Sequence, residues 1–151
     1  MKILTCLLVS LLFVGLYPYQ SKSSQMINIS KVWSRPVHAT TDNQGNFLSN
    51  GAVYLTITNS GTADTLMSVE TDVCKKVELH RSKMVDGMMT MHMLKKGLNV
   101  GEHGVVELKP GSYHIMLIGM QTNLDPGDTF PLTLMFKNSG SVTVISDVKN
   151  P

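Results

Sequence analysis

The sequence predicts an all-β domain, arranged as a Greek-key β-sandwich of about eight or nine strands. Short runs rich in β-branched and aromatic residues recur along the chain, and several alternate apolar with polar residues. Turn residues such as Asn-Ser-Gly and Pro-Gly separate these runs. After the N-terminal region, no segment has the clear period of an amphipathic helix. Strands at this spacing are typical of antiparallel sandwiches and barrels.

The expected strands of the N-terminal half are bounded by turn signals and polar segments. The run "INISKVW" alternates, and a polar loop rich in Gly and Asn, "HATTDNQGNFLSNG", follows it. "AVYLTITN" ends at Asn59-Ser60-Gly61, and "TLMSVET" comes next. We expect the following strand, "KKVELH", to end at His80. The Met-rich stretch after it includes the polar, Gly-containing "DGMMTMHM", so we do not expect a buried strand throughout it.

The C-terminal half continues the same pattern. "GVVELK" stops at Pro110-Gly111, "YHIMLIG" follows it, and "QTNLDPGD" is a turn. "TFPLTLMFK" and "SVTVISDV" are joined by Asn138-Ser139-Gly140, which predicts a hairpin. Pro131 has no N–H to donate to a neighbouring strand, so we expect it at the start of its strand or on a sheet edge.

The N-terminus has the layout of a secretory signal peptide. Lys2 precedes an apolar run from Ile3 to Leu16, and small polar residues follow it. We assign residues 1–24 to the signal, with Ser21-x-Ser23 as the expected cleavage site, and residues 25–151 to one domain. An uncleaved anchor stays open, because no clean A-x-A motif is present. We expect export to the periplasm and no stable membrane insertion of the mature chain, since no later apolar run approaches the length of a membrane span.

Charge and cysteine content exclude several classes of protein. The chain has 13 Lys and Arg against 11 Asp and Glu; removing Lys2 and Lys22 leaves 11 of each. A nucleic-acid surface would need clustered basic charge, so none is expected. Cys6 lies within the signal, so Cys74 stands alone and cannot form an intramolecular disulfide. We expect Cys74 to be a passive core residue, although a thiolate there could compete for a soft metal.

The strand "YHIMLIG" places two soft metal ligands on one face. Successive side chains of a strand point to opposite faces, so His114 and Met116 lie together. An imidazole nitrogen and a thioether sulfur form half of a site for a soft metal ion. The alternative is that Met116 fills the core and His114 is a surface or hydrogen-bonded histidine.

Methionine is concentrated in one other segment of the chain. Five of the eleven methionines lie between Lys83 and Met93. Exposed methionine has no packing advantage over leucine and needs a reason. One reason is a set of thioethers for Cu(I), which soft sulfur ligands select. The other is a flexible hydrophobic patch that docks a partner protein.

Four segments in order resemble the periplasmic copper(I) chaperones known as PCu(A)C proteins. They are "GAVYLTITNSGTADTLMSVE", "KKVELHRSKMVDGMMTMHM", "VVELKPGSYHIMLIGM" and "GDTFPLTLMF", and the resemblance covers roughly residues 28–147. It implies a cupredoxin-like sandwich. The family pattern is a His, ten residues, a Met, about twenty-one residues and then His-x-Met. Carried onto this sequence, it implies His80, Met91, His114 and Met116 as copper ligands.

Two departures from that pattern leave questions open. Here 22 residues separate Met91 from His114, one more than the family count. Met89 and Met93 share the face of Met91 on an extended chain, so either could replace it as a ligand. Cys74 is not part of the family pattern, and the sequence does not decide whether a second copper binds near the Met-rich stretch.

The resemblance implies a non-enzymatic metallochaperone that holds Cu(I) and passes it on by ligand exchange. The implied acceptor is another copper protein, chiefly cytochrome c oxidase. Two imidazoles and two thioethers form a neutral ligand set that suits Cu(I). No nucleophile or base stands in a recognisable triad context. We expect a monomer.

Three other functions remain possible at this point. The first is an adhesion or assembly module whose methionines form a docking patch and which binds no metal. The second is copper sequestration for tolerance, which would use the same site. The third is a blue-copper electron carrier, which the ligand types disfavour because such a site needs a Cys between its histidines in the chain.

Overall fold

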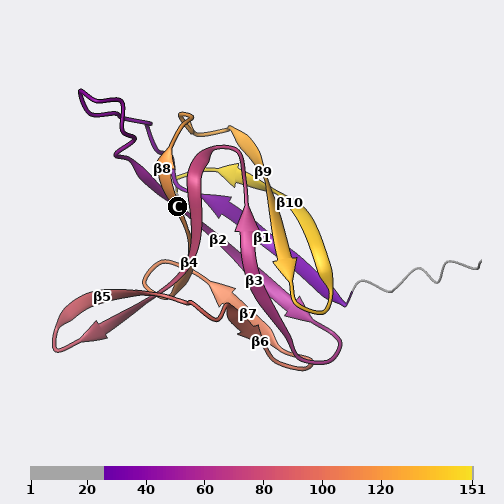
Figure 1. Cartoon of the computed structure of the whole chain (residues 1–151). Helices are drawn as coiled ribbons and strands as arrows, with labels where there is room; N and C mark the ends of the chain where they lie inside the picture. The colour runs from indigo at the N-terminus through magenta and orange to yellow at the C-terminus, as the bar shows by residue number, and fades with distance from the viewer. Residues whose placement is uncertain (1–25, 151) are drawn as a thin grey trace, which may run out of the picture.

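The computed structural model describes residues 26–150, and this range contains ten β-strands and no helix (Figure 1). The predicted signal peptide, residues 1–24, lies outside the described residues. The strands are β1 Ile27–Ser34, β2 Asn50–Asn59, β3 Asp64–Glu70, β4 Cys74–Val85, β5 Met88–Met93, β6 Leu98–Val100, β7 Val105–Leu108, β8 Tyr113–Met120, β9 Thr129–Phe136 and β10 Gly140–Val148. The all-β prediction is therefore confirmed. Within the described range, no helix is long and apolar enough to cross a bilayer.

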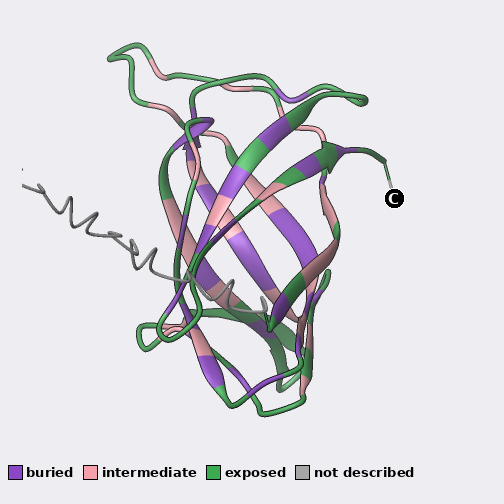
Figure 2. Cartoon of the chain, turned by 90° about the vertical axis from the view of Figure 1, so that its right-hand side faces the viewer, coloured by how far each residue is buried: buried purple, intermediate pink, exposed green. Residues whose placement is uncertain are grey.

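The strands form one continuous sheet that curls back over itself. Their order across the sheet is β5-β4-β8-β7-β2-β1-β10-β9-β3-β6. β1 pairs antiparallel with β2 and parallel with β10, so it joins the two layers. Figure 2 shows buried residues concentrated on the strands that face the inside of the curled sheet. The architecture is the predicted sandwich, with a strand that belongs to both layers.

Alternation of apolar and polar residues decides which face of each strand packs inward. In β9, Phe130, Leu132, Leu134 and Phe136 are buried, while the residues between them are exposed or partly exposed. Pro131 is the third residue of β9. It lies opposite Ile145 of β10, but the pairing of β9 with β3 on the other side begins only at Thr133. Its position near the start of the strand agrees with the prediction, because no β3 residue lies opposite it to need a backbone N–H.

The strand count and the length of β4 differ from the prediction of eight or nine strands. β4 does not end at His80 but continues to Val85, where it forms a hairpin with β5. The turn is Asp86-Gly87, and both residues have positive φ angles, 50° and 77°. Asp-Gly favours such a tight hairpin turn, so this local signal was available in the sequence. β6, with three residues, is the other short strand that the run pattern did not show.

A buried carboxylate fastens the β9–β10 turn to the start of β3. Asp64 accepts hydrogen bonds from the backbone N–H of Thr65 (2.7 Å) and Asn138 (2.9 Å). It also accepts bonds from the N–H and the hydroxyl of Ser139, at 2.9 and 2.6 Å. Burial opposes ionisation, but the hydrogen bonds from Ser139, Asn138 and Thr65 outweigh it and lower the pKa of Asp64.

Replacing Asp64 by Ala should therefore lower the free energy of unfolding by about 2–3 kcal/mol, because three backbone N–H groups and one hydroxyl lose their acceptor. Urea unfolding at neutral pH measures this, with the exposed Asp72→Ala as the control. The pKa of Asp64 is lowered on folding, so its stabilisation is present above the unfolded pKa and is lost as pH falls through the folded pKa. The difference between Asp64→Ala and the wild type should shrink at acid pH; a constant difference would contradict this role.

Candidate metal centre

Strand register brings the four residues singled out in the sequence onto one face of the sheet. His80 of β4 lies directly opposite His114 of β8, and Met116 lies opposite Glu78, two residues before His80. On the other side of β4, Met91 of β5 lies opposite Ser82, two residues after His80. Directly opposite residues share a face, as do residues two apart along a strand. The two histidines therefore lie side by side, with a thioether diagonal to them on each side.

The two imidazole rings are close enough to share one metal ion. Their centroids are 5.8 Å apart, and the ring planes are inclined by 51°. With metal–nitrogen bonds of about 2 Å, two imidazoles on one ion have centroids at most roughly 6 Å apart. The rings thus have the spacing that a shared ion requires.

His114 has one nitrogen tied to the backbone and the other available. Its side chain is buried, and Nδ1 lies 3.1 Å from the carbonyl oxygen of Ser112. A carbonyl only accepts, so Nδ1 carries the proton and donates it, which leaves the lone pair on Nε2. Burial lowers the pKa of His114, although the bond to Ser112 opposes this, and the ring is therefore kept neutral. A neutral imidazole is the form that ligates metals.

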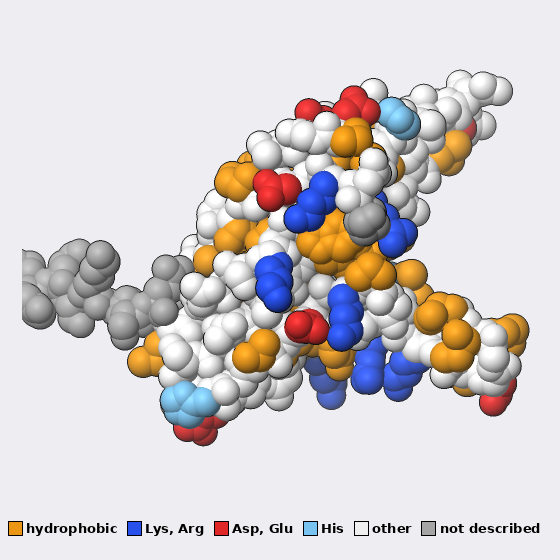
Figure 3. Space-filling view, turned by 180° about the vertical axis from the view of Figure 1, so that it is seen from behind, with side chains coloured by type: hydrophobic (Ala, Val, Ile, Leu, Met, Phe, Trp, Pro, Cys, Tyr) orange, Lys and Arg blue, Asp and Glu red, His pale blue; other side chains and the backbone are white. Residues whose placement is uncertain are grey.

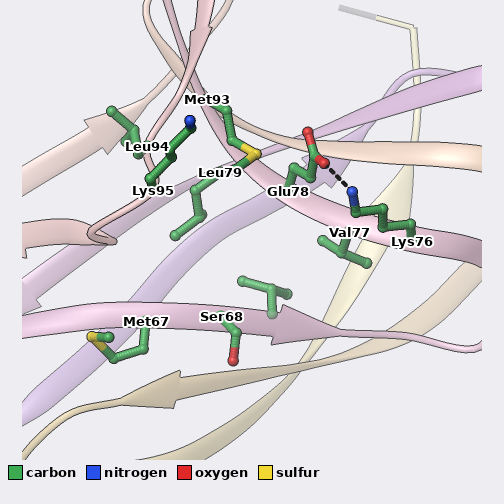
Figure 4. A pocket seen from close by; sticks show the side chains of 10 residues that line it. Met67, Ser68, Lys76, Val77, Glu78, Leu79, Met93, Leu94 and Lys95 are labelled. Atoms are coloured by element: carbon green, nitrogen blue, oxygen red, sulfur yellow. Dashed lines mark ion pairs between the residues drawn. The ribbon is translucent and has the colours of Figure 1, made fainter.

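His80 is hydrogen-bonded through its other ring nitrogen, Nε2. Its Nε2 lies 2.7 Å from Oε2 of Glu78, and Oε1 of Glu78 lies 2.5 Å from Nζ of Lys76 (Figure 4). The bond from Lys76, followed by the bond from His80, lowers the pKa of Glu78, so the carboxylate is ionised and accepts the Nε2 proton. Nδ1 of His80 is buried and has no hydrogen-bond partner among the described residues. A buried lone pair without a partner is costly unless a ligand uses it.

The carboxylate–histidine arrangement is the outer-shell pattern that metal-binding histidines use. A second group fixes the tautomer and the orientation of the ring, and thereby selects the nitrogen that faces the metal. Here Glu78 selects Nδ1 of His80, and the Ser112 carbonyl selects Nε2 of His114. The sequence analysis identified neither Glu78 nor Ser112. For Glu78 a signal was available, because in "ELH" it lies two residues before His80 and so shares its face.

Three thioethers of β5 border the histidines. Met93 lies directly opposite His80, and Met91 lies one step nearer the turn, across from the small side chain of Ser82. Met89 lies two residues further towards the turn, opposite Met84. Met91 and Met93 are 49% and 43% exposed, so both sulfurs can move. The structure places Met93 in the same row as the histidines, and Met89 lies farther from them than either Met91 or Met93.

A pocket of about 220 Å³ opens between β3 and β4 (Figure 4). Met93 and Glu78 line it, together with Met67 of β3. Seen from behind, hydrophobic side chains also gather on the projecting β4–β5 hairpin (Figure 3). The candidate centre therefore lies at the base of an exposed, methionine-rich arm.

The remaining histidines lie elsewhere. His38 is exposed in a loop, with Nδ1 3.9 Å from a carboxylate oxygen of Asp125, and His103 is in an exposed turn. His92 is opposite Arg81, on the other face of β5 from Met91 and Met93. His38 and His103 are therefore exposed to solvent, and His92 faces away from the candidate centre.

Cys74 lies at the start of β4 and is buried, as expected for a core cysteine. Its sulfur donates to the carbonyl of Lys76 at 3.3 Å. Burial raises the pKa of the Cys74 thiol, although backbone bonds at Lys76 and Ile118 oppose it, so the protonated form is favoured. Cys74 is six positions before His80, about 20 Å along the strand. The thiol is too far away to join the two histidines on one ion.

Neutral, soft groups set the chemistry of the candidate centre. Within residues 26–150, no three side chains of His, Cys, Asp or Glu gather closely enough to hold a metal ion. The side chains on this face that could add to the two histidines as ligands are the thioethers of Met91, Met93 and Met116. Of the charged residues of β4, Lys76 and Glu78 lie on the face of His80 and form an ion pair, so their charges cancel at the centre. Neutral surroundings of this kind favour an ion of low charge.

Comparisons with known proteins agree on family and fold. A family model described as "LpqE-like: Putative lipoprotein LpqE-like" matches residues 27–148. An uncharacterised protein of Rickettsia prowazekii is 29% identical over 82% of this chain and 67% of its own length. A putative lipoprotein of Leifsonia xyli is 26% identical over 85% of this chain and 73% of its own.

Solved structures share the fold at low sequence identity. The copper-bound PCuAC domain of PmoF2 has a TM-score of 0.63 and 20% identity, covering 83% of this chain and 94% of its own. The Cu(I) form of DR1885 from Deinococcus radiodurans has a TM-score of 0.59 and 24% identity, covering 87% and 85%. The cupredoxin-like PCuAC fold expected from the sequence is confirmed.

The two histidines should show opposite tautomers before any metal is added. We expect His114 to be protonated at Nδ1 and His80 at Nε2, because of the bonds to Ser112 and Glu78. Long-range ¹H–¹⁵N NMR of the imidazole nitrogens at neutral pH measures this. Glu78→Ala should shift the His80 nitrogens toward a tautomer mixture and leave those of His114 unchanged. The same tautomer in both rings would contradict the assignment.

Proposed function

We propose that this chain, which belongs to the LpqE-like family, is a copper chaperone. It binds one Cu(I) through His80, Met91, His114 and Met116. The observation that carries the proposal is the pairing of His80 with His114 across β4 and β8, with one buried ring nitrogen of His80 that has no partner within residues 26–150. Two proteins that share its fold are described as copper-bound and Cu(I)-bound. Their likeness supports copper as the cargo.

The donor set favours Cu(I) over other ions. Two neutral imidazoles and two thioethers supply no negative charge, which suits a monovalent soft ion. Zinc would prefer thiolates or carboxylates beside its histidines. Burial of His114 also keeps that ligand neutral.

Unequal exposure of the ligands suits release by exchange. His114 is buried and fixed by the Ser112 carbonyl, whereas Met91 is half exposed on a two-stranded arm. In our proposal the thioether of Met91 leaves first, an acceptor ligand takes its place, and the histidines release the ion last. The protein thus transfers a metal ion rather than catalysing a reaction.

The destination and the location of the protein belong to the same proposal. The acceptor is a copper protein on the exported side of the membrane, and the copper centre of cytochrome c oxidase is the acceptor that the PCu(A)C resemblance implies. The lipoprotein descriptions of the family and of the Leifsonia relative support export. We propose that the mature chain acts in the periplasm as a monomer.

One observation favours a second function. Met84, Met88, Met89, Met91 and Met93 are all exposed on a single hairpin, as a protein docking patch would require. An assembly module of this kind would bind no copper in stoichiometric amount. Copper sequestration would use the same ligands as the chaperone and would differ only in that no acceptor protein receives the ion.

Anaerobic competition for Cu(I) between residues 25–151 and a chromophoric chelator separates these functions. We expect one tightly bound Cu(I), and at least tenfold weaker binding in Met116→Leu and in His114→Gln, because each loses one ligand atom. His38→Gln, an exposed histidine outside the site, is the matched control. Cys74→Ser should bind as the wild type does.

Loss of binding in Cys74→Ser would move the site to the thiol and contradict the ligand assignment. Equal weakening by His38→Gln and His114→Gln would do the same. The absence of tight binding in the wild type would leave the docking module as the better account. Far-UV circular dichroism of each variant shows whether the fold is intact.

A further inference from the structure

The outer part of the β4–β5 hairpin carries thioethers that the four-ligand centre does not use. Met84 of β4 lies directly opposite Met89 of β5, next to the turn. Both are on the face that also carries Met91, because Met89 and Met91 are two residues apart. Met84 and Met89 are 64% and 55% exposed, so neither contributes substantially to the core.

The turn makes this pair a defined structural feature. Asp86 and Gly87 have φ angles of 50° and 77°, which fix a tight two-residue connection and with it the register of Met84 against Met89. Directly opposite residues have Cβ atoms about 4.5–5.5 Å apart. Methionine has three side-chain torsions beyond its Cβ, so both sulfurs can reach one small ion between them. A pair of neutral sulfurs is a ligand set for a soft monovalent cation.

The pair is separate from the histidine centre. Met84 is four positions after His80 on β4, about 13 Å along the strand. Met91 lies between the two places on the same face, opposite Ser82. An ion at the tip could therefore not use either histidine, and Met91 is the next thioether along the path from the tip to His80.

We propose that Met84 and Met89 form a second, weaker site for Cu(I) at the hairpin tip, from which Met91 passes the ion to the histidine centre. That the ion is Cu(I) rests on the proposed function, whereas the position of Met84 opposite Met89 rests on the hairpin register alone. Without an imidazole the tip site binds more weakly, so it fills second. An exposed weak site next to a tight one lets copper enter or leave the protein without exposing the buried histidine ligands.

The hairpin supplies its own matched control. Met88 is 68% exposed on the same strand, but it lies on the opposite face and its partner across the hairpin is Val85, which has no sulfur. Removing the thioether of Met88 therefore changes the hydrophobicity and sulfur content of the arm without touching the pair. Leucine is close to methionine in size, so these exposed substitutions should leave the fold intact.

The test is an anaerobic titration with Cu(I) of protein whose methionine methyl groups are labelled with ¹³C. Wild type should bind two equivalents: the first shifts the methyl signal of Met116, and the second shifts those of Met84 and Met89. The double variant Met84→Leu/Met89→Leu should keep the first equivalent and lose the second. Met88→Leu should keep both.

A single equivalent in the wild type, or a second equivalent that survives in the double variant, would overturn the proposed tip site while leaving the histidine centre in place. Loss of the second equivalent in Met88→Leu as well would show that copper binds to the β4–β5 hairpin without needing the Met84–Met89 pair. That result would also overturn the tip site. If instead the first ion already shifts Met84 and Met89 and leaves Met116 unchanged, the tip binds copper and it is the histidine centre that fails.

Discussion

The register of β4 against its two neighbours is the constraint on which the candidate centre depends. His80 comes from the middle of β4, and its neighbours come from chain positions that are far from it or across a turn. A slip of one residue between β4 and β8 would move His114 and Met116 to the opposite face from His80. The buried apolar residues Leu79, Ile115 and Leu117 oppose such a slip, because it would also take them out of the core.

Hydrogen bonds then convert two adjacent histidines into a pair with defined ligand atoms. Lys76 holds Glu78, Glu78 accepts from Nε2 of His80, and the Ser112 carbonyl accepts from Nδ1 of His114. These contacts come from the same strands that carry the histidines or from the turn next to them, so the sheet that positions the rings also orients them. The thioethers are less constrained, since those of β5 are exposed on a projecting hairpin (Figure 1). The result is a rigid pair of nitrogens next to mobile sulfurs.

Much of this arrangement could be predicted from the sequence because it is local. The period of two in "YHIMLIG" correctly places His114 and Met116 on one face, and turn residues correctly bound most of the strands. The position of Pro131 near the start of β9 was also predictable from local sequence, because the missing N–H is a property of that residue alone. The resemblance to PCu(A)C proteins also predicted the fold correctly.

The remaining features depend on contacts between distant residues, which a single sequence does not show. The extension of β4 to Val85 and the strand β5 were missed because most of their side chains are exposed and no alternating apolar pattern marks a buried face. The position of Met93 opposite His80 follows from the Asp86-Gly87 turn and could have been derived from it. That His80 faces His114, and that Ser112 bonds to His114, depends on the pairing of β4 with β8 and cannot be read from spacing.

The central claim is that one Cu(I) is held by two imidazoles and two thioethers on this face of the sheet. X-ray absorption spectroscopy of the protein loaded anaerobically with one equivalent of Cu(I) tests it most directly. The account predicts a Cu(I) edge and a first shell of two nitrogen and two sulfur neighbours, with the multiple-scattering features of imidazole. A shell made of sulfur alone, or one without imidazole scattering, would contradict it.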